Sequence, residues 1–268
     1  MNVDARSWLF TPGDRPERFP KAVASGAEAV ILDLEDAVAP DAKAEARTSV
    51  LAWLAQGHQA WVRVNDHQSA YWADDVSALV GSAGLLGVVL PKTESAADVA
   101  ETAARAGADV VALIESARGV ENADEIAQAP GAVALALGSA DLCLDARLGE
   151  DPLAWAYPRS RLVFASRAAG LRAPLDGPDM QLDNARITRT QAEQARACGF
   201  GGKLCIHPRQ VSPVDEAFGY THEQVAWARA VVAAAEHSHG AAVRVGGEMI
   251  DRPRLELARR IVAAEQEE

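Results

Sequence analysis

The pattern of strand-like and helical segments predicts an α/β protein, namely a TIM (β/α)8 barrel with a C-terminal helical extension. Helical or alanine-rich segments separate strand-like runs that begin near Ser7, Ala29, Ala60, Gly87, Asp109 and Val133, and weaker runs near Leu171 and Gly202. This alternation is typical of β/α units joined by right-handed crossovers, and eight such units close a barrel. The length of 268 residues, 49% of them hydrophobic, suits one barrel of ordinary size.

Three of the strand-like runs, at 29–32, 110–114 and 133–137, are almost continuously apolar. A strand with this pattern is buried on both faces, as in a parallel sheet that helices cover. The runs therefore predict strands of a barrel wall with helices around it.

Prolines and glycines mark the ends of the predicted helices. Pro16 opens one helix, Gly26 ends it, and Pro40 opens the next. Later helices are followed by Gly107, Gly170 and Gly199. Proline suits the first turn of a helix and glycine the position after its last turn, so we interpret these residues as structural.

The barrel is predicted over residues 1–210, and residues 211–268 form the C-terminal extension. The extension begins with a loop that contains Pro213, continues as a helix over about 221–239, turns at Gly246-Gly247 and ends in a helix from Arg252. A minimal barrel does not need this segment. We therefore expect it to act as a lid over a barrel mouth or to pack on a neighbouring subunit.

Charge and cysteine content limit the classes of partner and the compartment. The formal net charge of −12 makes nucleic acid and anionic membranes poor partners for the surface as a whole. Cys143, Cys198 and Cys205 form no C-x-x-C pair and are odd in number, so neither a disulfide framework nor a zinc knuckle is expected. No apolar stretch approaches the length of a membrane span. These observations predict a cytoplasmic protein.

Carboxylates follow the buried runs at Glu35-Asp36, Glu115 and Asp141. Residues at the carboxyl ends of barrel strands face the active-site mouth, and Mg²⁺ is usually held there by one or two carboxylates. The sequence therefore predicts Mg²⁺ as cofactor with Glu115 and Asp141 as its ligands, and solvated loop acids are the alternative. Glu35 and Asp36 are predicted to orient metal-bound water or to pair with Arg63.

Two basic residues are predicted to face the same mouth. Arg63 alternates with Val62 and Val64, so its side chain points into the barrel, where it binds a substrate carboxylate, an acid of the protein, or both. Lys92 follows another apolar run. Its amine can form a Schiff base only if its pKa is lowered. Because nearby acids keep that pKa high, an electrostatic role in substrate binding is favoured.

Arg15, Arg18 and Lys21 form a basic cluster just after the first strand. They lie at a helix N-terminal turn, where main-chain N–H groups also favour anions, and a solvated helix face is the alternative. We expect Arg15 and Lys21 to contact an anionic part of the substrate.

Further predicted substrate contacts at the mouth are Thr11, Ser139 and Ala140, which all follow strand-like runs. His207 ends the last strand-like run and is interpreted as a hydrogen-bonded structural residue, with a proton-transfer role as the alternative.

The sequence also contains a series of distinctive segments. In chain order they are RSWLFTPG at 6–13, DLEDAV at 33–38, RVN at 63–65, PK at 91–92, IESARGV at 114–120, GSADL at 138–142, GGK at 201–203 with IHPRQ at 206–210, and MID at 249–251. In this order, over nearly the whole chain, the sequence resembles the citrate lyase β-subunit and malyl-CoA or citramalyl-CoA lyase group of the HpcH/HpaI aldolase superfamily. The resemblance implies a Mg²⁺-dependent TIM barrel.

The resemblance also implies roles for individual residues. Glu115 and Asp141 correspond to the protein ligands of Mg²⁺, and Arg63 to the residue that contacts the keto acid. In the lyases that the chain resembles, the Asp of a C-terminal Met-x-Asp segment reaches the active site of an adjacent subunit as acid/base, and it corresponds to Asp251. Many relatives have Asp-Gly-Lys or a similar turn just upstream, where this chain has Gly246-Gly247-Glu248. That departure leaves open how this segment contacts the thioester and therefore which thioester is the substrate.

The implied reaction is retro-Claisen cleavage of a β-hydroxyacyl thioester of the citryl-, malyl- or citramalyl type, carried by CoA or an acyl carrier protein. Mg²⁺ chelates the hydroxyl and carboxylate, Arg63 fixes the carboxylate, and Asp251 protonates the enolate carbon. The products are an α-keto acid such as oxaloacetate and an acetyl thioester. Arg15, Arg18 or Lys21 then hold the phosphates of the carrier.

The resemblance further implies a homotrimer or a dimer of trimers, with membership of a citrate lyase-type complex as a further partner prediction. Two alternatives stay open. One is a Schiff-base aldolase that uses Lys92, and the other is a keto-acid-binding subunit that is active only in a larger complex.

Overall fold

The computed structural model describes residues 4–149, 151–237 and 243–267. Eight parallel strands form a closed barrel in which each strand pairs with the next along the chain and the last pairs with the first. The strands are β1 (Ser7–Pro12), β2 (Ala29–Asp33), β3 (Ala60–Arg63), β4 (Leu85–Leu90), β5 (Val110–Ile114), β6 (Ala132–Leu137), β7 (Leu175–Asp176) and β8 (Gly202–Cys205). The predicted TIM barrel is confirmed.

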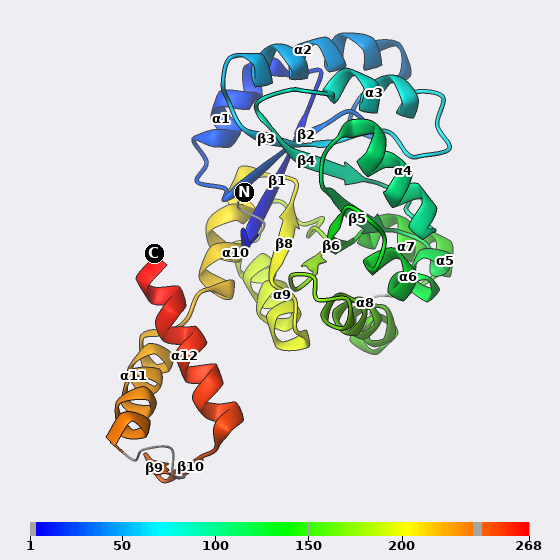
Figure 1. The fold of residues 1–268 in the computed structure, drawn as a ribbon. Helices are drawn as coiled ribbons and strands as arrows, with labels where there is room; N and C mark the ends of the chain where they lie inside the picture. The colour runs from blue at the N-terminus through cyan, green and yellow to red at the C-terminus, as the bar shows by residue number, and fades with distance from the viewer. Residues whose placement is uncertain (1–3, 150, 238–242, 268) are drawn as a thin grey trace. The chain divides into compact units, whose positions relative to one another are not determined.

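Helices surround the barrel and connect its strands (Figure 1). They are α1 (Phe19–Val23), α2 (Lys43–Ala55), α3 (Trp72–Leu79), α4 (Ala96–Ala106), α5 (Ala117–Glu121), α6 (Ala123–Ala127), α7 (Ser139–Ala146), α8 (Ala156–Ala168), α9 (Ala185–Cys198) and α10 (Val211–Phe218). Short 3-10 turns are η1 (Pro16–Arg18), η2 (Pro40–Ala42), η3 (Pro152–Trp155) and η4 (Pro208–Gln210). Among the described residues, no helix has both the length and the apolar character that crossing a bilayer requires.

Side-chain alternation along the strands divides the core into two layers. Inside the barrel, one cluster includes Trp8, Ile31, Trp61, Val111 and Leu113. A second cluster, between the strands and the helices, contains the intervening residues, among them Leu9, Leu32, Val62, Ala112 and Ile114. Because successive side chains of a strand point to opposite faces, the residue two positions after an interior residue also faces inward.

This alternation places charged residues at the carboxyl ends of the strands, which we call the mouth. Asp33 follows Ile31 by two positions, Arg63 follows Trp61, and Glu115 follows Leu113. Three strands that fill the barrel interior with apolar side chains therefore each have a charged side chain directed to the mouth, at the last position of β2 and β3 and directly after β5.

The loop predicted around Pro213 is instead a helix, α10. Pro213 is the third residue of α10, where its missing N–H interrupts no hydrogen bond within the helix. Val214 and Phe218 on α10 are buried in the outer core cluster. Accordingly, the first compact unit of the chain extends through Phe218.

Residues Gly219–Glu268 form a second compact unit. The helices α11 (His222–His237) and α12 (Arg252–Glu267) pack on each other, and β9 (Val243–Val245) pairs with β10 (Glu248–Ile250) in an antiparallel hairpin (Figure 1). The turn between these strands has φ angles of 58° at Gly246 and 90° at Gly247, which only glycine adopts easily. The predicted helices and turn are found, although positions 238–239 of the first predicted helix lie outside the described residues.

Candidate active site

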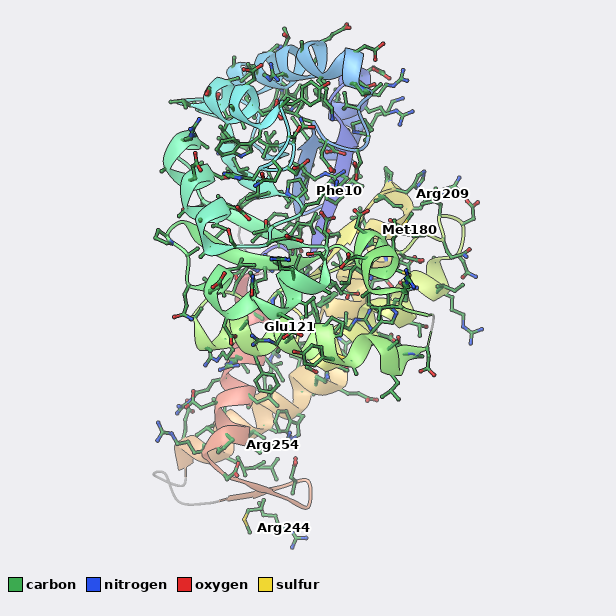
Figure 2. All side chains as sticks on the ribbon, turned by 90° about the vertical axis from the view of Figure 1, so that its right-hand side faces the viewer. Phe10, Glu121, Met180, Arg209, Arg244 and Arg254 are labelled. Atoms are coloured by element: carbon green, nitrogen blue, oxygen red, sulfur yellow. The ribbon has the colours of Figure 1, made fainter. Side chains whose placement is uncertain are left out.

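A cavity of about 360 Å³ opens at the mouth of the barrel. Its charged lining residues are Asp33, Asp36, Arg63, Glu115 and Asp141, and its apolar lining includes Phe10, Leu113, Met180, Leu204 and Ile206. Ser139 and Ala140 also line it. Phe10 on β1 and Met180 on the β7–α9 loop are labelled in Figure 2. The structure thus gathers into one cavity most of the residues for which the sequence predicts substrate or metal contacts.

Glu115 and Asp141 come from successive β/α units. Glu115 directly follows β5 and is 6% exposed, whereas the half-buried Asp141 lies in the first turn of α7 rather than at the strand end. One oxygen of Glu115, Oε2, accepts a hydrogen bond of 2.7 Å from the main-chain N–H of Lys92. Burial raises the pKa of Glu115 to about 8, and the charge of Asp141 acts in the same direction. Such a pair of carboxylates favours a cation between them.

Arg63 forms a two-pronged ion pair with Asp33, which is 1% exposed. Nε donates to Oδ1 of Asp33 at 2.7 Å, and Nη2 donates to Oδ2 at 2.6 Å. Nη1 lies 3.2 Å from Oε2 of Glu35, and the guanidinium stands 4.5 Å from the ring centroid of Phe10. This arrangement fixes the plane of the guanidinium at the cavity wall.

Asp33 is the site residue that the sequence interpretation missed. It attributed the partner role to Glu35 or Asp36, the two acids that end the same run. The available signal was the two-residue period of the strand, because Ile31 faces the barrel interior and Asp33 is the next residue on that face.

Glu35 joins Arg63 to Lys92. Its side chain is buried and accepts a hydrogen bond from the Lys92 amine, while Asp36 Oδ1 lies 3.6 Å from the same amine. Burial raises the pKa of Glu35, although Arg63 and Lys92 oppose this shift. Burial lowers the pKa of Lys92, but the bond to Glu35 and the charges of Glu35, Asp36 and Glu115 outweigh it and raise that pKa above its ordinary value. Lys92 is therefore a firmly protonated amine.

A buried lysine supports the β2–α2 loop that carries Glu35. The Lys43 amine donates to the main-chain oxygens of Leu34 and Glu35, at 2.8 Å each. The Asn65 amide donates to the same oxygen of Leu34 at 3.0 Å and to Oδ2 of Asp75 at 2.6 Å. Because these donors hold main-chain atoms, they fix the path of the loop.

Other predicted contacts lie outside the cavity lining. Thr11 is 4% exposed and does not line the cavity, because it lies between the lining residues Phe10 and Pro12 and faces the other side of β1. Arg15 and Lys21 are exposed near the start of α1, and Nε of Arg15 is 3.9 Å from the Asp14 carboxylate. Both basic residues are thus accessible to a ligand in solution.

His207 has a local structural contact. Its Nδ1 accepts a hydrogen bond of 3.1 Å from the main-chain N–H of Arg209, and His207 is the N-cap of η4. This contact matches the structural interpretation of His207.

Asp251 begins the last helix of the second unit. Its side chain is exposed, and Oδ1 accepts a hydrogen bond of 3.0 Å from the main-chain N–H of Arg254, as an N-cap residue does.

The charge balance of the cavity suits a divalent cation. Its four lining carboxylates and one guanidinium leave a formal surplus of three negative charges. Over the described residues, no group of three or more His, Cys, Asp or Glu side chains is arranged to hold a metal ion. Mg²⁺ usually takes one or two protein carboxylates and fills its remaining positions with water and substrate, so the two cavity carboxylates Glu115 and Asp141 are candidate ligands.

Comparison with protein families identifies the family of the chain. The model of the family described as HpcH/HpaI aldolase/citrate lyase matches residues 6–208. The chain belongs to this family. It is accordingly an enzyme of the lyase class.

Curated relatives of this HpcH/HpaI family member include lyases. A citrate lyase subunit beta-like protein of Mycobacterium tuberculosis is 41% identical over 266 residues, which cover 95% of this chain and 94% of that protein. An L-malyl-CoA/beta-methylmalyl-CoA lyase of Cereibacter sphaeroides is 33% identical over 302 residues, which cover 96% of this chain and 93% of the lyase. A (3S)-malyl-CoA thioesterase of the same species is 34% identical, with 96% and 93% covered.

Solved structures show the same fold with ligands. CitE of Mycobacterium tuberculosis, in complex with magnesium, acetoacetate and coenzyme A, matches this family member with a TM-score of 0.85 and 37% identity over 98% of each chain. A citrate lyase beta subunit of that organism, complexed with oxaloacetate and magnesium, matches with a TM-score of 0.71 and 38% identity. The second match covers 81% of this chain and 99% of that subunit.

Proposed function

We propose that this HpcH/HpaI family member is a Mg²⁺-dependent lyase that cleaves or forms the carbon–carbon bond of a β-hydroxyacyl thioester. The products of cleavage are an α-keto acid such as oxaloacetate and an acetyl thioester. The observation that carries the proposal is the gathering of Glu115, Asp141 and Arg63 around one cavity at the mouth. Relatives named malyl-CoA lyases, and one solved with magnesium, acetoacetate and coenzyme A, support it.

Glu115 and Asp141 are the proposed Mg²⁺ ligands. When bound, the ion supplies positive charge that lowers the pKa of the substrate hydroxyl and stabilises the oxygen that becomes the keto group. The cavity's formal surplus of three negative charges favours binding of such an ion. A bound cation would stabilise the ionised form of Glu115, which burial alone disfavours by raising the pKa of Glu115 to about 8.

Arg63 is proposed to bind the carboxylate of the keto acid. A guanidinium has five N–H donors, and the contacts to Asp33 and Glu35 leave some of them for a ligand. Asp33 fixes the guanidinium plane, so the substrate carboxylate meets a preoriented partner. Ser139 and Ala140, which line the same cavity, are proposed further contacts of the keto acid.

Asp251 is proposed to exchange the proton with the enolate carbon, in the active site of an adjacent subunit of a homotrimer or hexamer. Mixing two variants, Asp251→Asn and Asp141→Asn, tests this proposal. A mixed assembly contains some sites with an intact metal pair from one chain and an intact Asp251 from another, so activity should return after subunit exchange. Because Asn caps helices about as well as Asp, Asp251→Asn leaves the start of α12 intact. Full activity of Asp251→Asn alone would contradict the role, and His207, or a metal-bound water held by Glu35 and Asp36, would then be the better candidate.

Arg15 and Lys21 are proposed to contact the phosphates of CoA or of a carrier-protein arm. Both side chains are exposed, and arginine and lysine both form charge-assisted hydrogen bonds to phosphate groups. Arg15→Gln with Lys21→Gln should raise the KM for a CoA thioester and leave the KM for the free keto acid unchanged. Measuring the same KM change with a carrier-protein thioester shows whether CoA or a carrier protein is the natural carrier. The departure at Gly246-Gly247-Glu248 leaves this choice open.

The test of the proposed function is an assay of the purified chain on citryl-, malyl- and citramalyl-CoA, with Mg²⁺ and with EDTA. A lyase releases keto acid and acetyl-CoA in equal amounts and only with the metal. Release of free CoA without keto acid would indicate a thioesterase, the activity for which one relative is named. Inactivity on every thioester, restored by added partner subunits, would indicate a component of a citrate lyase-type complex.

The Schiff-base alternative has a separate test. A lysine nucleophile needs a lowered pKa, whereas acid neighbours raise the pKa of Lys92 above its ordinary value. Borohydride in the presence of a keto acid should therefore trap no covalent adduct. An adduct at Lys92, together with activity in EDTA, would replace the proposed mechanism.

A further inference from the structure

We propose that Lys92 and Gly138 form a cradle that holds Glu115 in position as a metal ligand. Lys92 acts through its main-chain N–H, and Gly138 acts through the absence of a side chain. This inference rests on the proposed function, because it concerns Glu115 as a ligand of Mg²⁺. It assigns a positioning role to two residues that do not themselves bind the ion.

The backbone of Lys92 has an unusual conformation. Its φ angle is 50°, in the left-handed region, and among the described residues only Arg147 shares this property without being glycine. Arg147 ends helix α7, where a left-handed residue is common. Lys92 ends no helix, and in its left-handed conformation its N–H donates to Oε2 of Glu115 at 2.7 Å. Such conformations are uncommon outside glycine and cluster at functional sites, so finding this one together with this contact supports a positioning role for Lys92.

Lysine at this position has a second use. Glycine adopts a left-handed conformation without strain, so the main-chain contact alone would favour glycine. The Lys92 amine, however, donates to Glu35, which also contacts Arg63. One residue therefore connects the metal ligand to the arginine pair, through its main chain on one side and its amine on the other.

Gly138 makes room for Glu115. A Cβ atom at Gly138 would lie 2.2 Å from Cγ of Glu115, 2.4 Å from Oε1 and 2.7 Å from Cδ. The φ angle of Gly138 is −91°, so the backbone does not itself require glycine. Its N–H donates to the main-chain oxygen of Ile114 at 2.8 Å, which ties Gly138 to the strand that carries Glu115. The close approach of Gly138 to Glu115 therefore follows from the pairing of β5 with β6.

Together these contacts fix the Glu115 side chain from two directions. A hydrogen bond holds one of its oxygens, and the Gly138 backbone packs against its Cγ and carboxylate. A ligand whose rotamer is fixed before the ion arrives loses less entropy on binding, so its affinity for the ion is higher. Loss of either contact should weaken Mg²⁺ binding while the barrel stays folded.

The experiment is Mg²⁺ titration by isothermal calorimetry on the purified full chain, with thermal unfolding of each variant as the check on folding. Gly138→Ala should weaken Mg²⁺ binding about tenfold or more, as changes to groups behind a metal ligand do. Gly149→Ala is the matched control, because a Cβ there meets nothing within 4 Å. It should bind Mg²⁺ as the wild type does. At saturating Mg²⁺, turnover of Gly138→Ala should recover, which a merely destabilised variant would not show.

A pair of Lys92 variants separates its two contacts. Lys92→Gly keeps the left-handed backbone and the N–H to Glu115, so Mg²⁺ affinity should stay within about twofold, while keto-acid affinity falls with the loss of the Glu35 contact. Lys92→Val disfavours the left-handed backbone and should weaken Mg²⁺ binding about as much as Gly138→Ala does. This pair also tests the inference if Gly138→Ala does not fold.

The outcomes distinguish this inference from the proposed function. If Glu115→Gln binds Mg²⁺ as tightly as the wild type, the metal site itself is wrong and the cradle fails with it. If Glu115→Gln loses the metal while Gly138→Ala and Lys92→Val keep wild-type affinity, only the cradle is wrong. Equal Mg²⁺ affinity of Lys92→Gly and Lys92→Val, both weak, would overturn the main-chain role of Lys92.

Discussion

Two arginine–carboxylate pairs lie at opposite ends of the barrel. At the mouth, Nε of Arg63 donates to Asp33 at 2.7 Å and Nη2 donates at 2.6 Å. At the amino ends of the strands, which we call the base, Nε of Arg6 donates to Glu28 at 2.7 Å and Nη2 lies at 2.5 Å. Both are arginine–carboxylate pairs, but the two donors of Arg63 meet different oxygens of Asp33, whereas both donors of Arg6 meet Oε1 of Glu28.

The surroundings of the two pairs differ. At the base, the Arg6 main-chain N–H also donates to the Glu28 carboxylate, and the Glu28 main-chain N–H donates to the Ser7 hydroxyl. Main-chain groups of both residues therefore take part in this ion-pair network. At the mouth, Arg63 has a second acid, Glu35, and faces a cavity. The same type of ion pair is thus joined to main-chain groups at the base but borders a cavity at the mouth, where we propose that Arg63 binds the keto acid.

The largest effect is expected from Glu115→Gln at the mouth. Loss of a charged ligand should lower Mg²⁺-dependent turnover more than about 100-fold, since changes behind a metal ligand already cost about 10–100-fold. The unfolding temperature should stay near that of the wild type, because the substitution keeps the side-chain shape. Glu121→Gln, at an exposed glutamate that ends α5, is the control and should behave as the wild type does. Near-normal turnover of Glu115→Gln would show that the mouth does not hold the metal ion through Glu115.

At the base, Trp8→Ala should have the largest effect on stability. Trp8 is fully buried, packs 5.0 Å from Trp61 between ring centroids, and donates to the main-chain oxygen of Ala5. Truncation should lower the free energy of unfolding by about 3–5 kcal/mol in urea titrations. Phe10→Ala, two residues along the same strand, should cost less stability but should weaken keto-acid binding, because Phe10 lies under Arg63. A reversed pattern would contradict the division between base and mouth.

The two pairs can be compared directly through Asp33→Asn and Glu28→Gln. Asp33→Asn removes the charge that orients Arg63, so the KM for the keto acid in the condensation reaction should rise about 10-fold. Glu28→Gln should leave that KM unchanged and lower the free energy of unfolding by about 1 kcal/mol or less, since the pair is partly exposed. Equal changes of KM in both variants would show that Asp33 acts only through overall stability.

The smallest effect concerns the pH dependence of stability at the base. Burial raises the pKa of Asp215 to about 6, the nearby Glu28 charge adds to this shift, and the Ser7 hydroxyl opposes it. The folded state therefore binds this proton more tightly than the unfolded state, and the stability it contributes is lost as pH rises from about 4 to about 6. Asp215→Asn should be more stable than the wild type by about 1 kcal/mol at pH 8, after allowance for partial exposure. Urea unfolding at pH 5 and pH 8 measures this difference, which should shrink at the lower pH.

The sequence by itself determined the barrel, because each strand carries its own signal of apolar burial between helices marked by proline and glycine. It also predicted Glu115, Asp141 and Arg63 at the mouth, since strand ends are fixed by local pattern and the barrel brings them together. Their roles as metal ligands and carboxylate partner stay predictions. The helix at Pro213 was missed because burial of Val214 and Phe218 against the barrel outweighs a local loop signal.

Only the tertiary structure showed that Arg63 contacts two acids, Asp33 and Glu35, at once. The two-residue alternation directs Asp33, the last residue of β2, to the same face as Ile31, but it gives no direction for Glu35 and Asp36, which lie beyond the strand end. The pairing of β2 with β3 sets Asp33 opposite Arg63 in the sheet. The cradle around Glu115 was likewise invisible in the sequence, because Lys92 and Gly138 meet Glu115 through main-chain atoms. A side-chain pattern carries no information about where a distant backbone N–H points or where two backbones approach closely.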